Sequence, residues 1–423
     1  MIVPSIDLMD GKTVQLVGGR EKALEAGDPL PIAERFALAG EIAVVDLDAA
    51  LGRGGNAELV KRCLRAAPCR VGGGIRSAAS AIAWLDAGAA KVVLGTAAVE
   101  NVLRELPRER VIAALDAEDG EIVVEGWRKK TGRAVADRMA EIRHLVGGFL
   151  VTFVEREGRM GGIDLEKVRP LVAAAGGARV TVAGGVTTAD DVAALDRLGA
   201  DAQVGMALYT GRLDLADAIA APLVSDRPDG LFPTLVADEA GVALGLAWSD
   251  RESLREAVRT RRGVYRSRRR GLWVKGEASG ATQDLLAVAL DCDRDAIRFT
   301  VRQHGAGFCH AGTRTCFGGA DTGLGALERT LVSRRTSAPP GSYTRRLFDD
   351  PDLLGKKLVE EARELAAAAA REDVAHEAAD VLYFTLVSLA RCGVPLADVL
   401  KVLDARALKV TRRPGDAKKE DPA

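Results

Sequence analysis

The stretches Gly73-Gly74-Ile75-Arg76-Ser77 and Gly184-Gly185-Val186 begin two blocks of sequence that match each other 111 residues apart. Each block continues with a helical pattern, a Gly-Ala pair, a β-branched run and a final glycine, and the pairs start at positions 88 and 199. The spacing is about half of residues 1–224, as expected when a half-barrel has been duplicated. We therefore predict a (β/α)8 TIM barrel for this region.

Short β-branched runs alternate with Ala- and Leu-rich helical stretches over the same region, which fits a barrel or a doubly wound sheet. The repeat favours the barrel. The runs expected to form buried parallel strands are residues 43–47, 91–95, 111–115 and 179–183.

Turn-rich and glycine-rich segments at 225–230 and 317–325 divide the remainder of the chain. Strand-like segments at 231–237, 242–248 and 296–301 lie between them, and two long amphipathic helices are expected at 353–371 and 374–392. The sequence therefore predicts a multidomain protein. Its parts are a barrel at 1–224, a central α+β, mostly β, metal-binding domain at 225–320, and an all-α domain at 321–423.

The composition narrows the function. The 423 residues carry a formal net charge of −1, so no overall field attracts nucleic acid or a membrane surface. No apolar run approaches the roughly 18 residues that a membrane span needs, and the N-terminus has no signal-peptide pattern. Six cysteines in a chain of this length do not indicate a disulfide framework. We expect a cytoplasmic protein that binds small molecules, without a nucleic-acid or membrane partner.

The pentapeptide Asp291-Cys292-Asp293-Arg294-Asp295 is the strongest chemical signal in the chain. If it is extended, its three aspartates share one face and Cys292 points to the other. Carboxylates suit Mg²⁺, whereas the thiolates of Cys292, Cys309 and Cys316 suit Zn²⁺. Three thiolates leave one tetrahedral position for a water whose pKa falls to roughly 7. The alternative is a set of inert cysteines beside a solvated acidic turn.

Residues 226–318 resemble phosphoribosyl-AMP cyclohydrolase. The metal cluster carries the match together with Tyr265-x-Ser267-Arg268, Trp273-x-Lys275-Gly276-Glu277-x-Ser279-Gly280 and Cys309-His310-x-Gly312. The resemblance implies zinc on the three cysteines, magnesium on Asp291, Asp293 and Asp295, and a homodimer that shares the zinc ligands. It also implies hydrolysis of the adenine N1–C6 bond, with His310 or His304 moving the proton. Ser267, Arg268 and Lys275 are the substrate-binding residues expected from these signatures.

Seven arginines lie within residues 259–270. Nucleic-acid binding is one interpretation, but Tyr265 is the only aromatic residue in the run that is suited to stacking on a base. A substrate with two phosphorylated riboses also needs arginines, and a solvated charged surface is the third interpretation. We favour the substrate phosphates.

Carboxylates three residues apart lie on one face of each predicted C-terminal helix. If the two helices pack antiparallel, Glu361, Glu364, Glu377 and Asp380 converge, and Mg²⁺ is the cation that would relieve their repulsion. Such an ion would bridge a triphosphate and orient the water that cleaves it. Two ordinary solvated acidic helix faces are the alternative. The basic residues near enough in sequence to hold phosphates are Arg345, Arg346, Lys356 and Lys357.

Residues 324–413 resemble phosphoribosyl-ATP pyrophosphohydrolase, an all-helical nucleotide pyrophosphohydrolase. The match is carried by Ser342-Tyr343-Thr344-x-Arg346-Leu347, Lys356-x-x-x-Glu360-Glu361 and Glu377-Ala378-Ala379-Asp380-x-Leu382-Tyr383. Fusion of this domain directly after a cyclohydrolase is the usual arrangement of the bifunctional enzyme.

In the barrel, Asp7 and Asp116 follow strands about half a barrel apart, so they are expected to face one mouth. Such a pair suits an isomerisation in which one carboxyl protonates the ribose ring oxygen and the other takes a carbon-bound proton. The glycines expected to form phosphate-binding loops are Gly73, Gly74, Gly184, Gly185 and Gly205.

The barrel resembles the isomerase of phosphoribosyl-formimino-aminoimidazole carboxamide ribotide. Ile6-Asp7-Leu8-x-Asp10-Gly11-Lys12, Val45-Asp46-Leu47-Asp48 and Gly205-x-Ala207-Leu208-Tyr209 match. The family's Thr-Asp/Glu-x-x-x-Asp-Gly-Thr/Met run is altered at 152–159, where an acidic residue is lost and Arg159 replaces threonine, and the loop at 15–19 is shortened.

Two interpretations follow for the barrel. It is either an active isomerase or a degenerate scaffold beside a bifunctional hydrolase, and the presence of both Asp7 and Asp116 favours activity. The whole chain is thus expected to be a multifunctional histidine-biosynthesis enzyme that uses Zn²⁺ and Mg²⁺ and binds ATP-derived phosphoribosyl nucleotides. A nucleotide- or RNA-binding regulator is the distant alternative.

Overall fold

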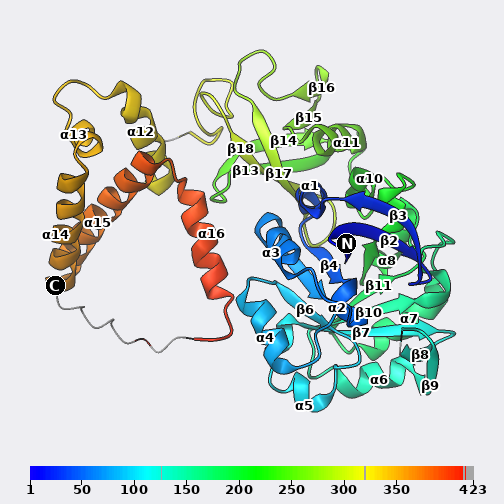
Figure 1. The fold of residues 1–423 in the computed structure, drawn as a ribbon. Coiled ribbons are helices and arrows are strands. Elements are labelled where there is room, and N and C mark those ends of the chain that lie inside the picture. The colour runs from blue at the N-terminus through cyan, green and yellow to red at the C-terminus, as the bar shows by residue number, and fades with distance from the viewer. Residues whose placement is uncertain (125, 319–320, 413–414, 416–423) are drawn as a thin grey trace. The chain divides into compact units, whose positions relative to one another are not determined.

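The computed structural model describes residues 1–124, 126–318, 321–412 and 415, and Figure 1 shows it as a ribbon. The chain divides into two compact units, one made of Met1–Gly312 with the segment that starts at Leu408, the other of Thr313–Ala407. The first unit therefore contains the predicted barrel and the predicted central domain up to Gly312, whereas residues 313–318 fall in the second unit. The proposed boundary at 320 and the tail residues 416–423 lie outside the described residues.

Eight parallel strands close the predicted barrel. Their order is β10-β11-β12-β1-β4-β5-β6-β7, and β7 pairs with β10 to complete the ring. Fully buried side chains such as Ile6, Val44 and Val92 lie on these strands, as expected for a parallel barrel covered by helices. The strands are β1 (Ile2–Met9), β4 (Ile42–Asp46), β5 (Cys69–Gly72), β6 (Lys91–Leu94), β7 (Val111–Glu118), β10 (Gly148–Phe153), β11 (Arg179–Ala183) and β12 (Ala200–Val204).

Helices connect these strands, and two hairpins extend from the barrel. The hairpins are β2 (Lys12–Val17) with β3 (Glu21–Gly27), which continue β1, and β8 (Glu121–Val124) with β9 (Lys129–Ala134), which continue β7. The helices are α1 (Pro29–Phe36), η1 (Ala37–Ala39), α2 (Leu47–Leu51), α3 (Ala57–Ala66), α4 (Ala78–Asp86), α5 (Glu100–Leu103), η2 (Arg108–Arg110), α6 (Val135–Ile142), η3 (Val154–Arg156), α7 (Leu165–Ala174), α8 (Ala189–Arg197), α9 (Met206–Tyr209) and α10 (Leu215–Ala220).

The central domain is a mixed four-stranded sheet with the order β14-β13-β18-β17. Its core, which includes the buried ring of Phe299, is continuous with the hydrophobic core of the barrel. The sheet strands are β13 (Phe232–Ala237), β14 (Ala243–Ser249), β17 (Gln283–Leu290) and β18 (Ile297–Gln303). Helix α11 (Arg251–Thr260) and the hairpin of β15 (Val264–Ser267) and β16 (Gly271–Val274) complete the domain.

The central domain packs against the amino-terminal end of the barrel strands. The guanidinium of Arg251 donates to the carbonyl oxygens of Ala220 (2.9 Å), the last residue of α10, and of Leu223 (3.2 Å) just beyond it. Arg294 of the β17–β18 loop pairs with Asp196 in the last turn of α8. Because helices run opposite to the strands they connect, the end of α8 lies at the amino-terminal end of the barrel. The opposite end, where barrel enzymes place their sites, is not used for this contact.

Residues 291–295 are not extended. They form the loop between β17 and β18. Two physical causes are visible. The Asp291 carboxylate accepts the backbone N–H groups of Asp295 (3.1 Å) and Ala296 (3.0 Å), which closes a turn. Arg294 has φ +67°, in the left-handed region. Strict alternation of side chains, with Cys292 opposite the aspartates, therefore does not apply.

The second unit is entirely helical in its described residues. Asp350 caps α14 through the N–H of Leu353, and Gly393 in left-handed conformation ends α15. A small core around Leu347, Phe384 and Val387 holds the helices together. The helices are α12 (Gly323–Ser337), α13 (Tyr343–Asp349), α14 (Pro351–Ala367), α15 (Arg371–Cys392) and α16 (Leu396–Ala407).

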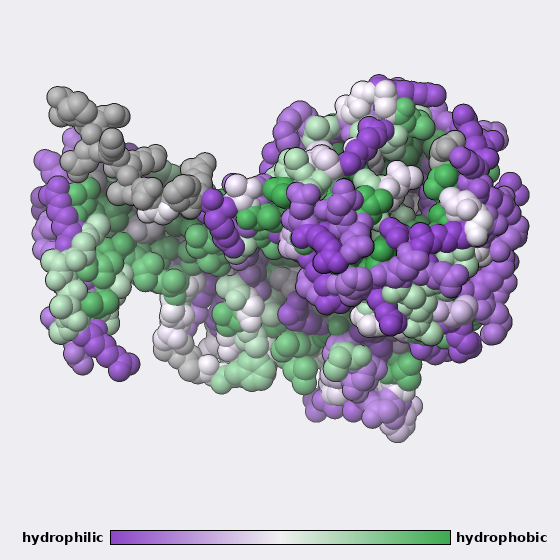
Figure 2. Space-filling model, turned by 90° about the horizontal axis from the view of Figure 1, so that it is seen from below, coloured by the Kyte–Doolittle hydropathy of each residue, from purple (hydrophilic) through white to green (hydrophobic). Residues whose placement is uncertain are grey.

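Hydrophobic residues also lie at the surface of the helical unit, as Figure 2 shows for the face in view. Val359 on α14 is 51% exposed and Leu403 on α16 is 51% exposed. Across the described part of the chain, no helix combines the length and the hydropathy that a membrane span requires.

Candidate active sites

The two aspartates of the barrel lie on opposite strands. Asp7 is on β1 and Asp116 is on β7, which are four strands apart in either direction around the ring. Both line one cavity of about 470 Å³ at the carboxyl-terminal end of the strands. The structure thus brings together the two carboxyls that the sequence predicted to share a mouth.

Burial raises the pKa of both groups. The pKa of Asp7 rises from 3.8 to about 7 because its carboxylate is largely removed from bulk water. Burial also raises the pKa of Asp116, although hydrogen bonds from Trp127 and from Thr152, its neighbour on β10, partly oppose the rise. A carboxyl with a pKa near neutrality, as Asp7 has, can donate and accept protons at physiological pH.

Glu157 is a third acidic residue of the cavity, and it is not among the site residues predicted from the sequence. It follows β10 and η3, lines the same cavity, and has a pKa raised to about 7 by burial and by the charges of Asp7 and Asp116. The sequence signal that could have identified it is an acidic residue followed by a glycine, Glu157-Gly158, shortly after the end of a strand. The run at 152–159 that departs from the family pattern therefore still supplies a carboxyl to the mouth.

The five predicted phosphate-loop glycines all line this cavity. Gly73 and Gly184 have φ angles of +94° and +85°, and a Cβ at these positions would lie 2.1 Å and 2.5 Å from the carbonyl oxygens of Asp46 and Phe153. Only glycine fits such contacts. The loops lead into α4 and α8, whose capping boxes begin at Ser77 and Thr188. The two helix N-termini are related by the sequence repeat, and both favour anions.

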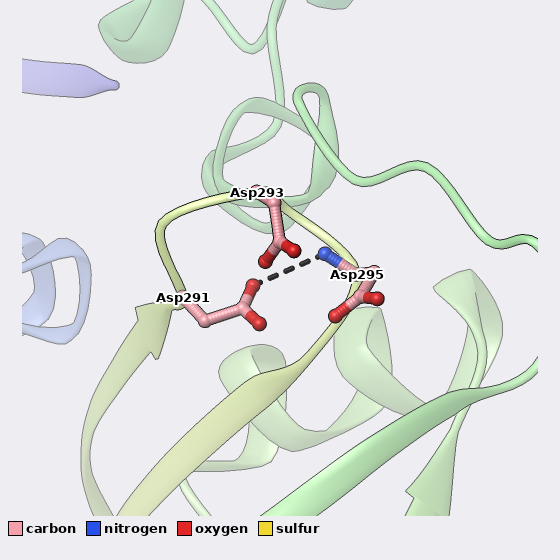
Figure 3. Close-up of side chains that lie close together, drawn as sticks. All are labelled: Asp291, Asp293 and Asp295. Atoms are coloured by element: carbon pink, nitrogen blue, oxygen red, sulfur yellow. Dashed lines mark hydrogen bonds between the residues drawn. The ribbon is translucent and has the colours of Figure 1, made fainter.

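In the central domain, Asp291, Asp293 and Asp295 do converge, although the segment is a loop (Figure 3). One oxygen of each carboxylate lies within 4.8 Å of the others. The hydrogen bond with Asp291 and the charge of Asp293 raise the pKa of Asp295. Three close carboxylates that repel each other form an oxygen donor set suited to a divalent cation.

The predicted zinc ligands are divided between the two units. Cys292, exposed, and Cys309, half-buried, belong to the first unit, and Cys316, exposed, belongs to the second. The two cysteines of the barrel have a different environment. Cys63 and Cys69 are buried, and burial raises the pKa of Cys63 to about 11. Accessible thiols are the ones that can become thiolate ligands.

The two candidate histidines are exposed. His310 follows Cys309 directly in the sequence. The Nε2 atom of His304 lies 2.8 Å from a carboxylate oxygen of Asp284, so this ring already has a hydrogen-bond partner.

The substrate-binding residues expected in this domain occupy different environments. Ser267 ends β15, and its hydroxyl accepts the N–H groups of Arg269 and Arg270 in the turn. The guanidinium of Arg268 lies 5.4 Å from the ring centre of Trp248. Lys275 is buried, and its ammonium donates to the carbonyls of Ala281 (3.2 Å) and Gly307 (3.3 Å). Lys275 therefore fixes backbone in this structure.

The helical unit brings three of its four predicted carboxylates together. Glu361 and Glu364 on α14 and Glu377 on α15 each place an oxygen within 4.8 Å of the others. Burial, followed by the charges of Glu361 and Glu377, raises the pKa of Glu364. Asp380, one turn further along α15, is exposed and is not a member of this group.

The basic residues near this cluster divide into two kinds. Lys357 pairs with Glu360 (2.9 Å) and Glu361 (2.7 Å), and these contacts raise the pKa of its ammonium. Lys356 lines an open groove on α14 together with Glu364. On α13, Arg345 pairs with Asp349 (2.9 Å) and Arg346 is exposed.

Comparison with known proteins matches three consecutive regions of the chain to three families. Residues 1–214 match the family described as histidine biosynthesis protein, and the chain belongs to that family. Residues 245–318 match the phosphoribosyl-AMP cyclohydrolase family and residues 324–407 the phosphoribosyl-ATP pyrophosphohydrolase family. It is therefore a histidine-biosynthesis protein with an isomerase-like barrel followed by two hydrolase domains.

Individual relatives cover different parts of this arrangement. A histidine biosynthesis trifunctional protein of Komagataella pastoris is 54% identical over 207 residues, which are 49% of this chain and 24% of the relative. The bifunctional protein his7 of Schizosaccharomyces pombe is 52% identical over 207 residues, 49% of each chain. The match thus covers about a quarter of the first of these fungal proteins and about half of the second. An imidazole-4-carboxamide isomerase of Halobacterium salinarum is 44% identical over 236 residues, 52% of this chain and 96% of the relative.

Proposed function

We propose that this chain catalyses three successive steps of histidine biosynthesis. The helical domain hydrolyses phosphoribosyl-ATP to phosphoribosyl-AMP and pyrophosphate. The central domain opens the adenine ring by hydrolysis of the N1–C6 bond. The barrel then isomerises the resulting formimino ribotide, whose two phosphates fit the two glycine loops.

The single observation that carries this proposal is the cavity with Asp7 and Asp116 on opposite strands between two related phosphate loops. Isomerisation of an aminoaldose needs an acid at the ring oxygen and a base at the adjacent carbon. Two carboxyls with raised pKa values, one on each side of a substrate held by both ends, satisfy that need. A degenerate scaffold would have no requirement for these buried ionisable groups, which reduce stability when charged.

In the helical domain, Glu361, Glu364 and Glu377 would hold Mg²⁺, and their mutual repulsion supports this assignment. Bound Mg²⁺ would neutralise phosphate charge and orient a water for attack. Asp380 remains a proposed further ligand. Lys356, Lys357, Arg345 and Arg346 would bind the phosphates, and Lys357 already orients Glu361 through an ion pair.

In the central domain, Cys292, Cys309 and Cys316 would hold zinc, and their accessible thiols support this assignment. Zinc with three thiolate ligands would supply an activated water at neutral pH. Asp291, Asp293 and Asp295 would hold Mg²⁺. His310 would move the proton during ring opening, while Ser267, Arg268 and Lys275 would shape the substrate pocket.

We further propose that the protein is a homodimer in the cytoplasm. The match of residues 245–318 to the phosphoribosyl-AMP cyclohydrolase family supports the dimer, because that resemblance implies zinc ligands shared between two copies. Thiolate ligands also suit a reducing compartment. A regulator that binds nucleotides or RNA is disfavoured because Arg259 and Arg266 in the arginine run are paired with carboxylates.

The experiment that tests the barrel is direct supply of the formimino ribotide to the purified full-length chain. We expect isomerised product from the parent and from Cys309→Ser, but not from Asp7→Asn or Asp116→Asn. If the parent leaves the formimino ribotide unchanged while it still hydrolyses phosphoribosyl-AMP, the barrel is a scaffold and the protein a bifunctional hydrolase.

A further inference from the structure

The acidic loop, defined as residues 291–295 between β17 and β18, has one basic side chain, and that side chain contacts the barrel. Both ends of the Arg294 guanidinium donate to the carboxylate of Asp196 on α8, each at 3.0 Å. The pair is well shielded, since the side chains of Arg294 and Asp196 are 19% and 10% exposed. A bidentate, partly buried pair of this kind constrains geometry as well as adding binding energy.

Arg294 also determines the shape of the acidic loop. Its guanidinium donates to the backbone carbonyl of Asp291 at 2.5 Å, and its own carbonyl accepts the N–H of Val224 at 2.9 Å, just before the central domain. Its left-handed φ of +67° reverses the chain, so that Asp295 N–H reaches the Asp291 carboxylate. The orientation of the three carboxylates therefore depends on where Arg294 is held.

Asp196 belongs to a network of charges at the amino-terminal end of the barrel strands, where the α-amino group of Met1 lies 2.9 Å from Asp196 and 3.0 Å from Asp201. The nearby Asp201, 1% exposed, accepts two hydrogen bonds from Arg179 (2.9 and 2.6 Å). Arg70 lies 3.6 Å from Asp201 and pairs at 2.7 Å with Glu41. Burial opposes ionisation of Asp196, yet the hydrogen bonds with Arg294 and with the α-amino group of Met1 keep its pKa below the usual value. Because its members are fixed by several contacts, the network offers a rigid anchor.

We propose that Asp196 and Arg294 are positioning residues for the divalent cation site formed by Asp291, Asp293 and Asp295, so that the barrel is a structural part of the cyclohydrolase metal site. This inference rests on the proposed magnesium site of the central domain. It gives the barrel a role in ring opening that is separate from its own cavity at the opposite end of the strands.

The alternative is that the Arg294–Asp196 pair only holds two domains together. Arg255 and Asp217 provide a comparison at the same domain contact. They form a second, more exposed ion pair (2.6 Å; side chains 54% and 34% exposed) between the central domain and the barrel without touching the acidic loop. A variant at Asp217 removes a carboxylate from the same domain contact and leaves the loop unchanged.

The test compares Asp196→Asn with Asp217→Asn in full-length, zinc-loaded protein. Glu364→Gln and Glu377→Gln are present in every sample, so that the helical cluster does not bind the probe. Mn²⁺ is titrated and followed by electron paramagnetic resonance, and a variant with Asp291, Asp293 and Asp295 all changed to Asn gives the zero reference. Hydrogen exchange of the Asp295 and Ala296 amides is measured separately without Mn²⁺.

We expect Asp196→Asn to weaken Mn²⁺ binding about fivefold to tenfold and to speed exchange of the two amides by a similar factor, as for loss of one shielded charge pair. Asp217→Asn should change both by less than about twofold. Equal effects of the two variants, or parent-like binding and exchange in Asp196→Asn, would overturn the positioning role. If the parent binds no more Mn²⁺ than the zero reference, the magnesium assignment fails, and the inference fails with it.

Discussion

Replacement of Asp7 by Asn should stabilise the barrel while it abolishes isomerisation. The pKa of Asp7 is raised from 3.8 to about 7, so the folded protein holds this proton more tightly than the unfolded chain does. At pH 8 the carboxyl is ionised in both states, and the full cost of burying the charge then lowers the free energy of unfolding. The pKa difference corresponds to an upper limit of about 4 kcal/mol. Because Asp7 retains contact with an open cavity, we expect about 2 kcal/mol of stabilisation in Asp7→Asn.

Because the pKa of Asp7 is raised in the folded state, the stabilisation that Asp7→Asn provides depends on pH. Below pH 3.8 the carboxyl is protonated in both states and contributes no penalty. As the pH rises towards 7, the unfolded chain releases the proton first, and the wild-type barrel loses stability relative to Asp7→Asn. Above pH 7 the difference is constant. The advantage of the variant should therefore be much smaller at pH 5 than at pH 8.

The assay is urea-induced unfolding of the full-length protein at pH 5 and pH 8, together with the rate of isomerisation. Asp119→Asn is the control, since Asp119 lies on the exposed β7–β8 turn, 3.3 Å from Lys130. It should change stability by less than about 1 kcal/mol at either pH. Loss of a catalytic acid or base should lower the rate about 10²- to 10⁴-fold. The argument from burial would be refuted if Asp7→Asn were less stable than wild type at pH 8. It would also be refuted if the difference in free energy of unfolding between variant and wild type were the same at pH 5 and pH 8.

Three further predictions concern the other sites. Glu364→Gln should abolish pyrophosphate release and Mg²⁺ binding by the helical domain but leave phosphoribosyl-AMP hydrolysis intact. Retained pyrophosphate release would contradict the assignment of the carboxylate cluster as a metal site. Cys309→Ser should lower both the zinc content and the rate of ring opening, whereas Cys63→Ser should keep a full zinc complement. Equal zinc content in the two variants would show that Cys309 is not a zinc ligand. Asp86→Ala should speed hydrogen exchange of the Val410 and Thr411 amides about tenfold, because the Asp86 carboxylate accepts both N–H groups. Unchanged exchange would show that this contact does not hold the segment that contains Val410 and Thr411.

Most of the barrel could be predicted from sequence because its strands are buried on both faces and read as β-branched runs. The predicted strand at 179–183 coincides with β11. The strand at 43–47 is displaced by one residue, since the Asp46 carboxylate caps the N–H of Ala49 and Leu47 already begins α2. Side-chain caps of this kind set boundaries that periodicity alone does not reveal.

The sites were predictable where a regular element placed them. Asp7 and Asp116 came together because the carboxyl ends of barrel strands meet at one mouth, and Glu361 and Glu364 because they are three residues apart on α14. Asp380 follows Glu377 at the same spacing on α15 but is not in the cluster, because spacing within one helix does not determine which of its turns faces the next helix. Glu157 was missed because it lies in a loop whose path depends on tertiary contacts, including the bond from Gly18 N–H to its carbonyl.

The acidic loop shows the same limit for a short segment. An extended conformation placed three aspartates on one face, but the turn closed by Asp291 and reversed at Arg294 brings them together by another route. The partner that holds Arg294 is almost 100 residues away in the sequence, on α8. No local pattern carries that information.

The most direct measurement of the whole account is the identity of the final product formed from phosphoribosyl-ATP by the purified chain with Mg²⁺ and Zn²⁺. Three working sites predict release of pyrophosphate and accumulation of the isomerised aminoketose ribotide, with accumulation shifting to the formimino compound in Asp7→Asn. Accumulation of the formimino compound by the wild-type chain, or no turnover beyond phosphoribosyl-AMP with zinc bound, would contradict the account.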